Sequence, residues 1–191
     1  MTVTFFDIDE TLFSTCAKIL VRNSNTGKIK RKLNNREFNT YKLKNGEVFD
    51  FVEFSDTNIF IKTSSPITKV IEILKESYNN GEEVYLLTAR PDFDNKQAFI
   101  DFLNSHGINA GHKNDGKIHV IRAGNIKGSD SATKKKNIIK QILKTKKYSS
   151  AKMYEDSMEN LEAFKSLSKD FNIIFKCYSI FEENIIDLNL V

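Results

Sequence analysis

The sequence predicts an α/β fold with a mainly parallel sheet, and three features of the chain support this prediction. Short apolar runs rich in β-branched and aromatic residues alternate with segments whose apolar residues recur at helical spacing. The helical segments have about 10–15 residues, the length that connects neighbouring parallel strands in βαβ units. Several apolar runs end directly at polar side chains, as strands do at the carboxyl edge of a parallel sheet. Together these features indicate a Rossmann-like three-layer sandwich.

The N-terminal part begins with a strand and continues in a segment of different character. Residues 3–6 read as a buried strand that ends at three carboxylates, Asp7, Asp9 and Glu10. Residues 13–65 read as a β-rich insert, in which we expect two β-hairpins and no helix of any length over 13–60. Their turns are expected at residues 24–27, Ser-Asn-Thr-Gly, and at residues 45–46, Asn-Gly.

From residue 66 onward, helix and strand are expected to alternate. Pro66 suits a helix start, and the apolar residues of 67–74 recur at helical spacing until Gly81 breaks the pattern. The later elements are a strand over 83–89, a helix over 94–105 closed by Gly107, a strand over 117–123, a helix over 132–146, a strand over 151–157, a helix over 158–169 and a last strand over 172–178. A chain of 191 residues fits a single domain, 1–191, that contains the insert.

Bulk properties narrow the class of protein. The formal net charge of +4, from 29 basic and 25 acidic residues, permits an anionic partner without requiring one. No apolar run reaches the roughly 20 residues of a membrane span, and the chain begins directly with a strand, so we expect neither a membrane segment nor a signal peptide. Cys16 and Cys177 lie far apart and suggest no disulfide framework, which favours a cytoplasmic location.

Polar side chains follow the predicted strands of the sheet. Because the carboxyl ends of parallel strands meet at one edge, we expect these side chains in one crevice. They are Asp7, Asp9 and Thr11 after the first strand, Thr88 and Arg90 after the strand over 83–89, a lysine of 134–136 at a helix start, and Glu155, Asp156 and Asn160 after the strand over 151–157.

This set of side chains suits phosphoryl chemistry. Carboxylates from two strands can hold Mg²⁺, which prefers oxygen ligands and relieves the repulsion of clustered negative charges. An aspartate can carry a phosphoryl group covalently. Asp9 lies two residues after Asp7, points the same way in an extended chain, and can act as acid and base. A lysine and a hydroxyl can stabilise the charge of the phosphoryl oxygens.

The pattern resembles the haloacid dehalogenase superfamily of phosphohydrolases. The first motif of that family, a strand followed by Asp-x-Asp-x-Thr, is matched by "FFDIDETLF", and the second, a Ser or Thr that ends a strand, by Thr88 in "VYLLTAR". The third, a lysine at a helix start, lies within "TKKKNIIKQIL", and the fourth, an acidic strand end, is matched by "YEDSMEN". All four motifs occur in order, and the resemblance covers about residues 1–15 and 66–180.

The resemblance implies a role for each matching residue. Asp7 would be the nucleophile and Asp9 the general acid and base, with Thr88 and Lys135 as further catalytic residues. Mg²⁺ would be held by the carboxylates of Asp7 and Asp156 and by the backbone carbonyl of Asp9. An aspartate at position 9 favours phosphoryl transfer over dehalogenation, because it offers a proton to the leaving oxygen.

Several assignments leave alternatives open. Lys135 has the family's spacing to the apolar residues of the helix, but Lys134 remains a candidate. Thr11 and Arg90 would contact substrate, although Arg90 equally fits a surface ion pair. Glu155 and Asn160 depart from the family's pattern and would contact the metal ligands without binding the metal themselves. In isolation, Asp7, Asp9 and Thr11 also fit a turn with a helix cap.

The insert bears on the substrate. A small β-rich flap or cap would leave the cleft open to a large substrate, and it carries a basic cluster that could grip phosphates, namely Lys28, Lys30, Arg31, Lys32 and Arg36. The "LTAR" stretch is similar to the phosphatase domain of polynucleotide kinase–phosphatase enzymes. We therefore expect a nucleotide or polynucleotide 3′-phosphate as substrate. The alternatives are a phosphatase of a small metabolite, a phosphotransferase and a non-catalytic phosphate-dependent switch; Asp9 argues against the last of these.

Overall fold

A computed structural model describes residues 1–111, 117–127 and 130–189 of the chain. Its centre is a seven-stranded sheet in the order β12-β11-β10-β1-β7-β9-β8. β12 runs antiparallel to β11, and the remaining neighbours pair in parallel, which confirms the predicted α/β fold with a mainly parallel sheet. The strands are β1 (Thr2–Phe6), β7 (Glu83–Thr88), β8 (Ala110–Gly111), β9 (Ile118–Arg122), β10 (Ser150–Glu155), β11 (Ile174–Phe181) and β12 (Asn184–Asp187).

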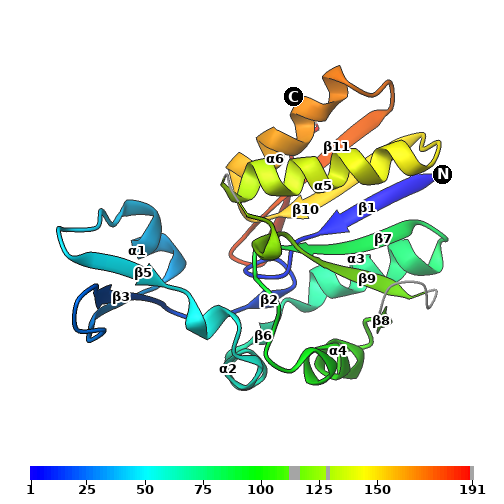
Figure 1. Ribbon diagram of the computed structural model, residues 1–191. Coiled ribbons are helices and arrows are strands. Elements are labelled where there is room, and N and C mark those ends of the chain that lie inside the picture. Colours follow the sequence, from blue (N-terminus) through cyan, green and yellow to red (C-terminus); the bar gives the residue numbers. More distant parts are fainter. Residues whose placement is uncertain (112–116, 128–129, 190–191) are drawn as a thin grey trace.

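Helices cover both faces of this sheet (Figure 1). α3 (Thr68–Asn79) and α4 (Lys96–Ser105) lie on one face, and α5 (Ser131–Thr145) and α6 (Met158–Lys165) lie on the other, followed by the 3₁₀-helix η3 (Ser166–Lys169). Successive side chains of a strand point to opposite faces, so Phe6 joins the core under α3 and α4, whereas Phe5 joins the core under α5 and α6. The central strands are therefore apolar on both faces.

The segment between β1 and α3 forms a separate small sheet. β3 (Ile19–Asn23), β4 (Ile29–Leu33) and β5 (Glu47–Asp50) are antiparallel in the order β4-β3-β5. This sheet stands clear of the large one, on the side to which the arrow of β1 points (Figure 1). Its two connections to the large domain run past β2 (Phe13–Ser14), which pairs with β6 (Ser65–Pro66). The predicted turn over residues 24–27 connects β3 to β4 as expected.

The second predicted hairpin of the insert is wrong. The segment before Asn45-Gly46 contains the helix α1 (Asn35–Thr40), and β5 pairs with β3 instead. A reciprocal capping box starts α1, since the Asn34 side chain accepts from the Glu37 backbone N–H and the Glu37 side chain accepts from that of Asn34. The 3₁₀-helix η1 (Val52–Phe54) and α2 (Thr57–Thr63) also contradict the expectation of no helix before residue 60.

Element boundaries differ from the predictions in a few further places. Pro66 lies in β6 opposite Phe13, and the helix begins two residues later at Thr68. β8 and β12 were not predicted, because they are short and carry no alternating apolar pattern. η2 (Ala123–Asn125) follows β9. Within the described parts of the chain, none of the helices combines the length and apolar character that a membrane crossing requires.

Candidate active site

Two neighbouring central strands bring the acidic residues together. β1 and β10 are parallel with Phe6 opposite Tyr154, so Asp7 follows one strand where Glu155 ends the other. The Asp7 backbone N–H continues the ladder by donating to the Tyr154 carbonyl at 3.0 Å. Carboxylates far apart in sequence thus meet because their strands end at the same edge of the sheet, as the topology rule predicts.

Lys135 is the cation that faces these carboxylates. Its Nζ donates to Asp7 Oδ1 at 2.6 Å and to Glu155 Oε2 at 2.7 Å, and all three residues are buried. On α5 it shares the buried face with Ala132, Ile139 and Leu143, at helical spacing. Lys135, rather than Lys134, is therefore the lysine that this helix presents to the strand ends.

The charges in this cluster shift one another's protonation. Burial, together with the negative charge of Glu155, raises the pKa of Asp7 to about 8, although Lys135 opposes the rise. Although Asp156 is exposed as a residue, desolvation of its carboxyl group and the charges of Asp7 and Glu155 raise its pKa as well. Burial acts to lower the pKa of Lys135, but the two carboxylates outweigh it and hold that pKa above its usual range. The single positive charge of Lys135 therefore does not balance the negative charges of Asp7, Glu155 and Asp156.

The shortage of positive charge fits a metal site. Asp7, Glu155 and Asp156 each offer a carboxylate oxygen, and these atoms lie within 4.8 Å of one another. Oxygen ligands at this spacing suit a hard divalent cation. Glu155, which the sequence predicts to contact the ligands without binding the metal, is itself one of the three grouped carboxylates. The Asp9 carboxylate is not part of this group, because it turns toward Arg90.

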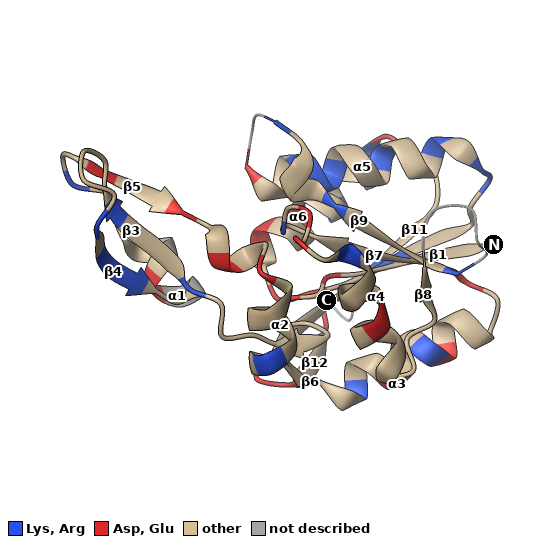
Figure 2. Cartoon of the chain, turned by 60° about the horizontal axis from the view of Figure 1, so that its bottom comes forward, with Lys and Arg blue, Asp and Glu red and all other residues tan. Residues whose placement is uncertain are grey.

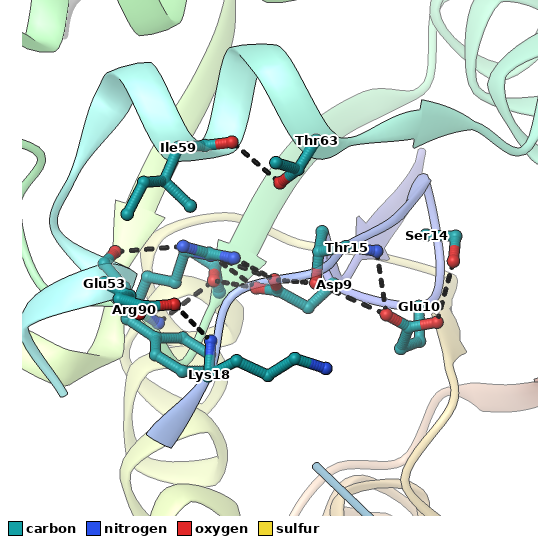
Figure 3. A network of polar contacts seen from close by, with 11 residues as sticks. Asp9, Glu10, Ser14, Thr15, Lys18, Glu53, Ile59, Thr63 and Arg90 are labelled. Atoms are coloured by element: carbon teal, nitrogen blue, oxygen red, sulfur yellow. Dashed lines mark hydrogen bonds and ion pairs between the residues drawn. The ribbon is translucent and has the colours of Figure 1, made fainter. Parts of the chain in front are cut away.

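Asp9 is held by an arginine (Figure 3). The Arg90 Nε donates to both Asp9 carboxylate oxygens at 2.9 Å, and Nη2 donates to Asp9 Oδ1 at 2.6 Å. Thr88 Oγ1 lies 3.4 Å from Asp9 Oδ2 and accepts from the Arg90 backbone N–H at 3.0 Å. The two residues predicted at the end of β7 therefore both contact the predicted acid and base.

The expected substrate contacts of Arg90 and Thr11 do not match their surroundings. Arg90 is 1% exposed, and its remaining terminal nitrogen, Nη1, donates to the Phe54 carbonyl at 3.0 Å. Thr11 is fully buried, and its Oγ1 finds no hydrogen-bond partner among the described residues. Both side chains lie beneath the surface, which favours supporting roles. Asn160 is also buried and lies in the first turn of α6, which Ser157 caps.

Thr15 and Glu10 complete the loop after β1. The Thr15 hydroxyl lies 3.1 Å from Asp9 Oδ1, and the Glu10 carboxylate accepts from the Thr15 backbone N–H at 2.9 Å. Glu10 adopts a φ of 54°, which folds the chain back so that residues 13–15 return to the acidic strand end. Sequence reasoning missed Thr15, because this contact depends on the turn and no spacing rule signals it.

A cleft of about 640 Å³ opens beside the acidic cluster. Asp156 lies in its wall, next to the loop after β1 and the turn between β11 and β12. Among the described residues, all the charged side chains that line it are acidic, namely Glu10, Asp156, Glu182 and Glu183. The cleft gives a small molecule access to Asp156.

Three residues of the predicted basic cluster, Lys30, Arg31 and Lys32, lie on the edge strand β4 of the insert (Figure 2), whereas Lys28 precedes this strand and Arg36 lies in α1. Lys30, Arg31 and Lys32 are exposed, but they do not share one face, since Arg31 lies opposite Val21 and Lys32 opposite Leu20. Lys30 and Lys32 each lie 3.4 Å from a glutamate, Glu47 and Glu53 respectively, and Arg31 lies over the Tyr41 ring. The cluster is therefore partly neutralised and divided between two surfaces.

No protein-family model, curated protein or solved structure matches this chain. Similarity therefore assigns neither a family nor an activity.

Proposed function

We propose that this protein is a Mg²⁺-dependent phosphomonoester hydrolase of the haloacid dehalogenase type, with Asp7 as the nucleophile. One observation supports this most strongly: a buried aspartate at a strand end is paired at 2.6 Å with a lysine and grouped with two further carboxylates. A second aspartate, Asp9, follows two residues later and is separately held by Arg90. Nucleophile and acid-base group thus occupy different electrostatic surroundings, as their different tasks require.

The residues divide the reaction between them. An Asp7 oxygen forms the bond to phosphorus while the ester P–O bond breaks, and Asp9 delivers a proton to the leaving oxygen. Asp9 then takes a proton from the water that hydrolyses the aspartyl-phosphate. Lys135 stabilises Asp7 as a carboxylate and lies close enough to it to offset negative charge on the transferred group.

A bound divalent cation would supply the positive charge that the acidic cluster lacks and would screen the phosphate from the attacking carboxylate. Asp7 and Asp156 are the residues to hold it, with Glu155 beside them. Mg²⁺ fits this all-oxygen donor set.

Two substrate classes have support on the surface of the molecule. The exposed basic strand β4 favours a nucleotide or a polynucleotide 3′-phosphate. The cleft beside Asp156 favours a small phosphorylated metabolite, because its acidic lining repels a polyanion. A phosphotransferase would use the same residues and differ only in the acceptor of the phosphoryl group.

The test is a hydrolysis screen with Mg²⁺ across nucleotides, sugar phosphates and oligonucleotides with a 3′-phosphate. We expect phosphate release that stops on chelation with EDTA and returns when Mg²⁺ is restored. Adding alcohol acceptors separates hydrolysis from phosphotransfer through the products. No release from any phosphomonoester, or release that persists after thorough chelation, would contradict the proposal.

A further inference from the structure

We propose that Arg90 is a positioning residue for Asp9 and that it ties Asp9 to both ends of the insert. The inference rests on the phosphatase function proposed above and adds to it a role for Arg90 and for the base of the insert. It differs from the substrate contact that the sequence predicts for Arg90.

The contact between the two side chains fixes the orientation of the carboxylate. Three distances of 2.9, 2.9 and 2.6 Å join Nε and Nη2 of Arg90 to the two oxygens of Asp9. A guanidinium is planar, so such a fork holds the carboxylate in its own plane and sets the direction in which Asp9 presents its oxygens. A lysine in the same place would supply charge without this direction.

Arg90 is itself held on every side. Its guanidinium carbon lies 4.7, 4.9 and 5.5 Å from the ring centroids of Phe54, Phe60 and Phe93. Gly124 packs against the Arg90 backbone so closely that a Cβ there would lie 2.5 Å from the Ala89 oxygen and the Arg90 carbonyl carbon. Because protein interiors cannot yield by that much without rearrangement, the arginine is a rigid support.

The same contacts reach both connections of the insert. Thr15, in the segment that leads into it, donates to Asp9 Oδ1 at 3.1 Å. Phe54, in the segment that leads out, accepts from Arg90 Nη1 at 3.0 Å. Asp9 therefore lies between the two ends of the insert and touches one of them directly and the other through Arg90. A change in the position of the insert would change the orientation of Asp9.

The burial of Arg90 distinguishes this role from a phosphate clamp. The side chain is 1% exposed, and Nε, Nη1 and Nη2 all have acceptors within the protein. A substrate phosphate would have to displace Asp9 to reach it. Substitution of Arg90 should therefore act on kcat through Asp9 and leave the KM for a small ester unchanged.

The test compares Arg90→Lys with the wild type on two esters of different leaving group. We expect kcat to fall about 10–100-fold for an alkyl phosphate, a share of what proton transfer contributes, with KM within about twofold. The loss should be smaller for p-nitrophenyl phosphate, whose leaving group needs less protonation. In an Asp9→Asn background the Arg90→Lys change should cost nothing further.

Two further variants guard against a simple folding effect. Gly124→Ala alters neither charged group but displaces the Arg90 backbone, and we expect it to lower kcat in the same leaving-group-dependent way. Arg22→Lys changes an arginine paired with Asp50 at 2.6 Å within the insert, and it should leave kcat unchanged. A raised KM with unchanged kcat, or an undiminished loss in the Asp9→Asn background, would overturn the proposal.

A failure of the proposed phosphatase function can be distinguished from a failure of the proposed role of Arg90. A wild type without activity towards any phosphomonoester contradicts the phosphatase, but the pairing can still be tested by thermal unfolding. Asp9→Asn and Arg90→Met should each lower Tm by about 10 °C, and the double variant by much less than their sum, since removing one partner leaves the other charge buried. Additive shifts would show that Arg90 does not act on Asp9.

Discussion

The strand-end site and the basic strand β4 of the insert both carry several charged side chains, but these charges are buried at the strand ends and exposed on β4. At the strand ends, Lys135 meets Asp7 and Glu155 at 2.6 and 2.7 Å in the interior. On β4, Lys30 and Lys32 meet glutamates at 3.4 Å, with about half of each lysine side chain exposed. Buried charges interact strongly because little water screens them, whereas exposed pairs contribute little to stability. Substitutions at the first region should therefore have large effects and those at the second small, substrate-specific ones.

The largest effect should come from Asp7→Asn. An amide cannot form the acyl phosphate, so we expect turnover to fall at least about 1,000-fold, as it does when other covalent nucleophiles are removed. Asp9→Asn should cost about 10²–10⁴-fold through lost proton transfer. Initial rates with Mg²⁺ measure both, and Asp170→Asn, at a surface aspartate paired with Lys140, is the matched control. Near-normal rates for Asp7→Asn would remove the nucleophile assignment.

The next effect concerns stability and the same cluster. Lys135→Met leaves Asp7 and Glu155 buried without their cation, and we expect it to lower the free energy of unfolding by about 3–5 kcal/mol. Lys140→Met breaks a pair of similar length, 2.7 Å, on the surface, and should cost less than about 1 kcal/mol. Urea denaturation at pH 7 without metal compares the two variants. Equal losses of unfolding free energy in the two variants would mean that burial does not strengthen the contribution of Lys135 to stability.

The response to pH and Mg²⁺ should follow from the raised pKa of Asp7. That pKa is about 8 in the folded protein, against 3.8 for an ordinary aspartate, so between these limits the folded state binds more protons than the unfolded state. Stability without metal should therefore fall as pH rises from 5 to 8. Mg²⁺ should raise stability by about 3 kcal/mol near 100-fold excess over its Kd, and more at pH 8 than at pH 5. Tm measured at both pH values, with Mg²⁺ and with EDTA, tests this; a Tm that does not respond to Mg²⁺ at pH 8 would count against the site.

The smallest effect should come from the insert. Charge reversal at Lys30 and Arg31 should change the free energy of unfolding by less than about 1 kcal/mol, because both residues are exposed. If β4 binds a polynucleotide, KM for an oligonucleotide 3′-phosphate should rise about 10-fold at low salt, with p-nitrophenyl phosphate unaffected. Charge reversal at the exposed Lys165 and Lys169 makes the same change in net charge and is the control. Unchanged KM for both substrates would favour the small metabolite.

Much of the fold follows from local patterns in the chain. The strands over 83–88 and 150–155 and the helix over 131–145 lie within a residue or two of their predicted bounds, because apolar periodicity is a local property. Parallel topology then requires that the residues after β1, β7 and β10 gather at one edge. The meeting of Asp7 and Asp156 was predictable on that ground, and the helical spacing of α5 places Lys135 on its buried face.

Tertiary structure decided the rest. The Asn-Gly turn does not specify which strand β5 pairs with. In the structure β5 pairs with β3, and the segment expected to pair with β5 contains α1, which begins with a capping box. The pairing of Asp9 with Arg90 spans 81 residues, and Arg90 packs against three phenylalanines, Phe54 in η1, Phe60 in α2 and Phe93 in the loop after β7. Sequence patterns report which residues are apolar and which element they favour. The partner of a polar side chain depends on where the remaining elements pack, since a buried charge takes the opposite charge that packing brings within reach.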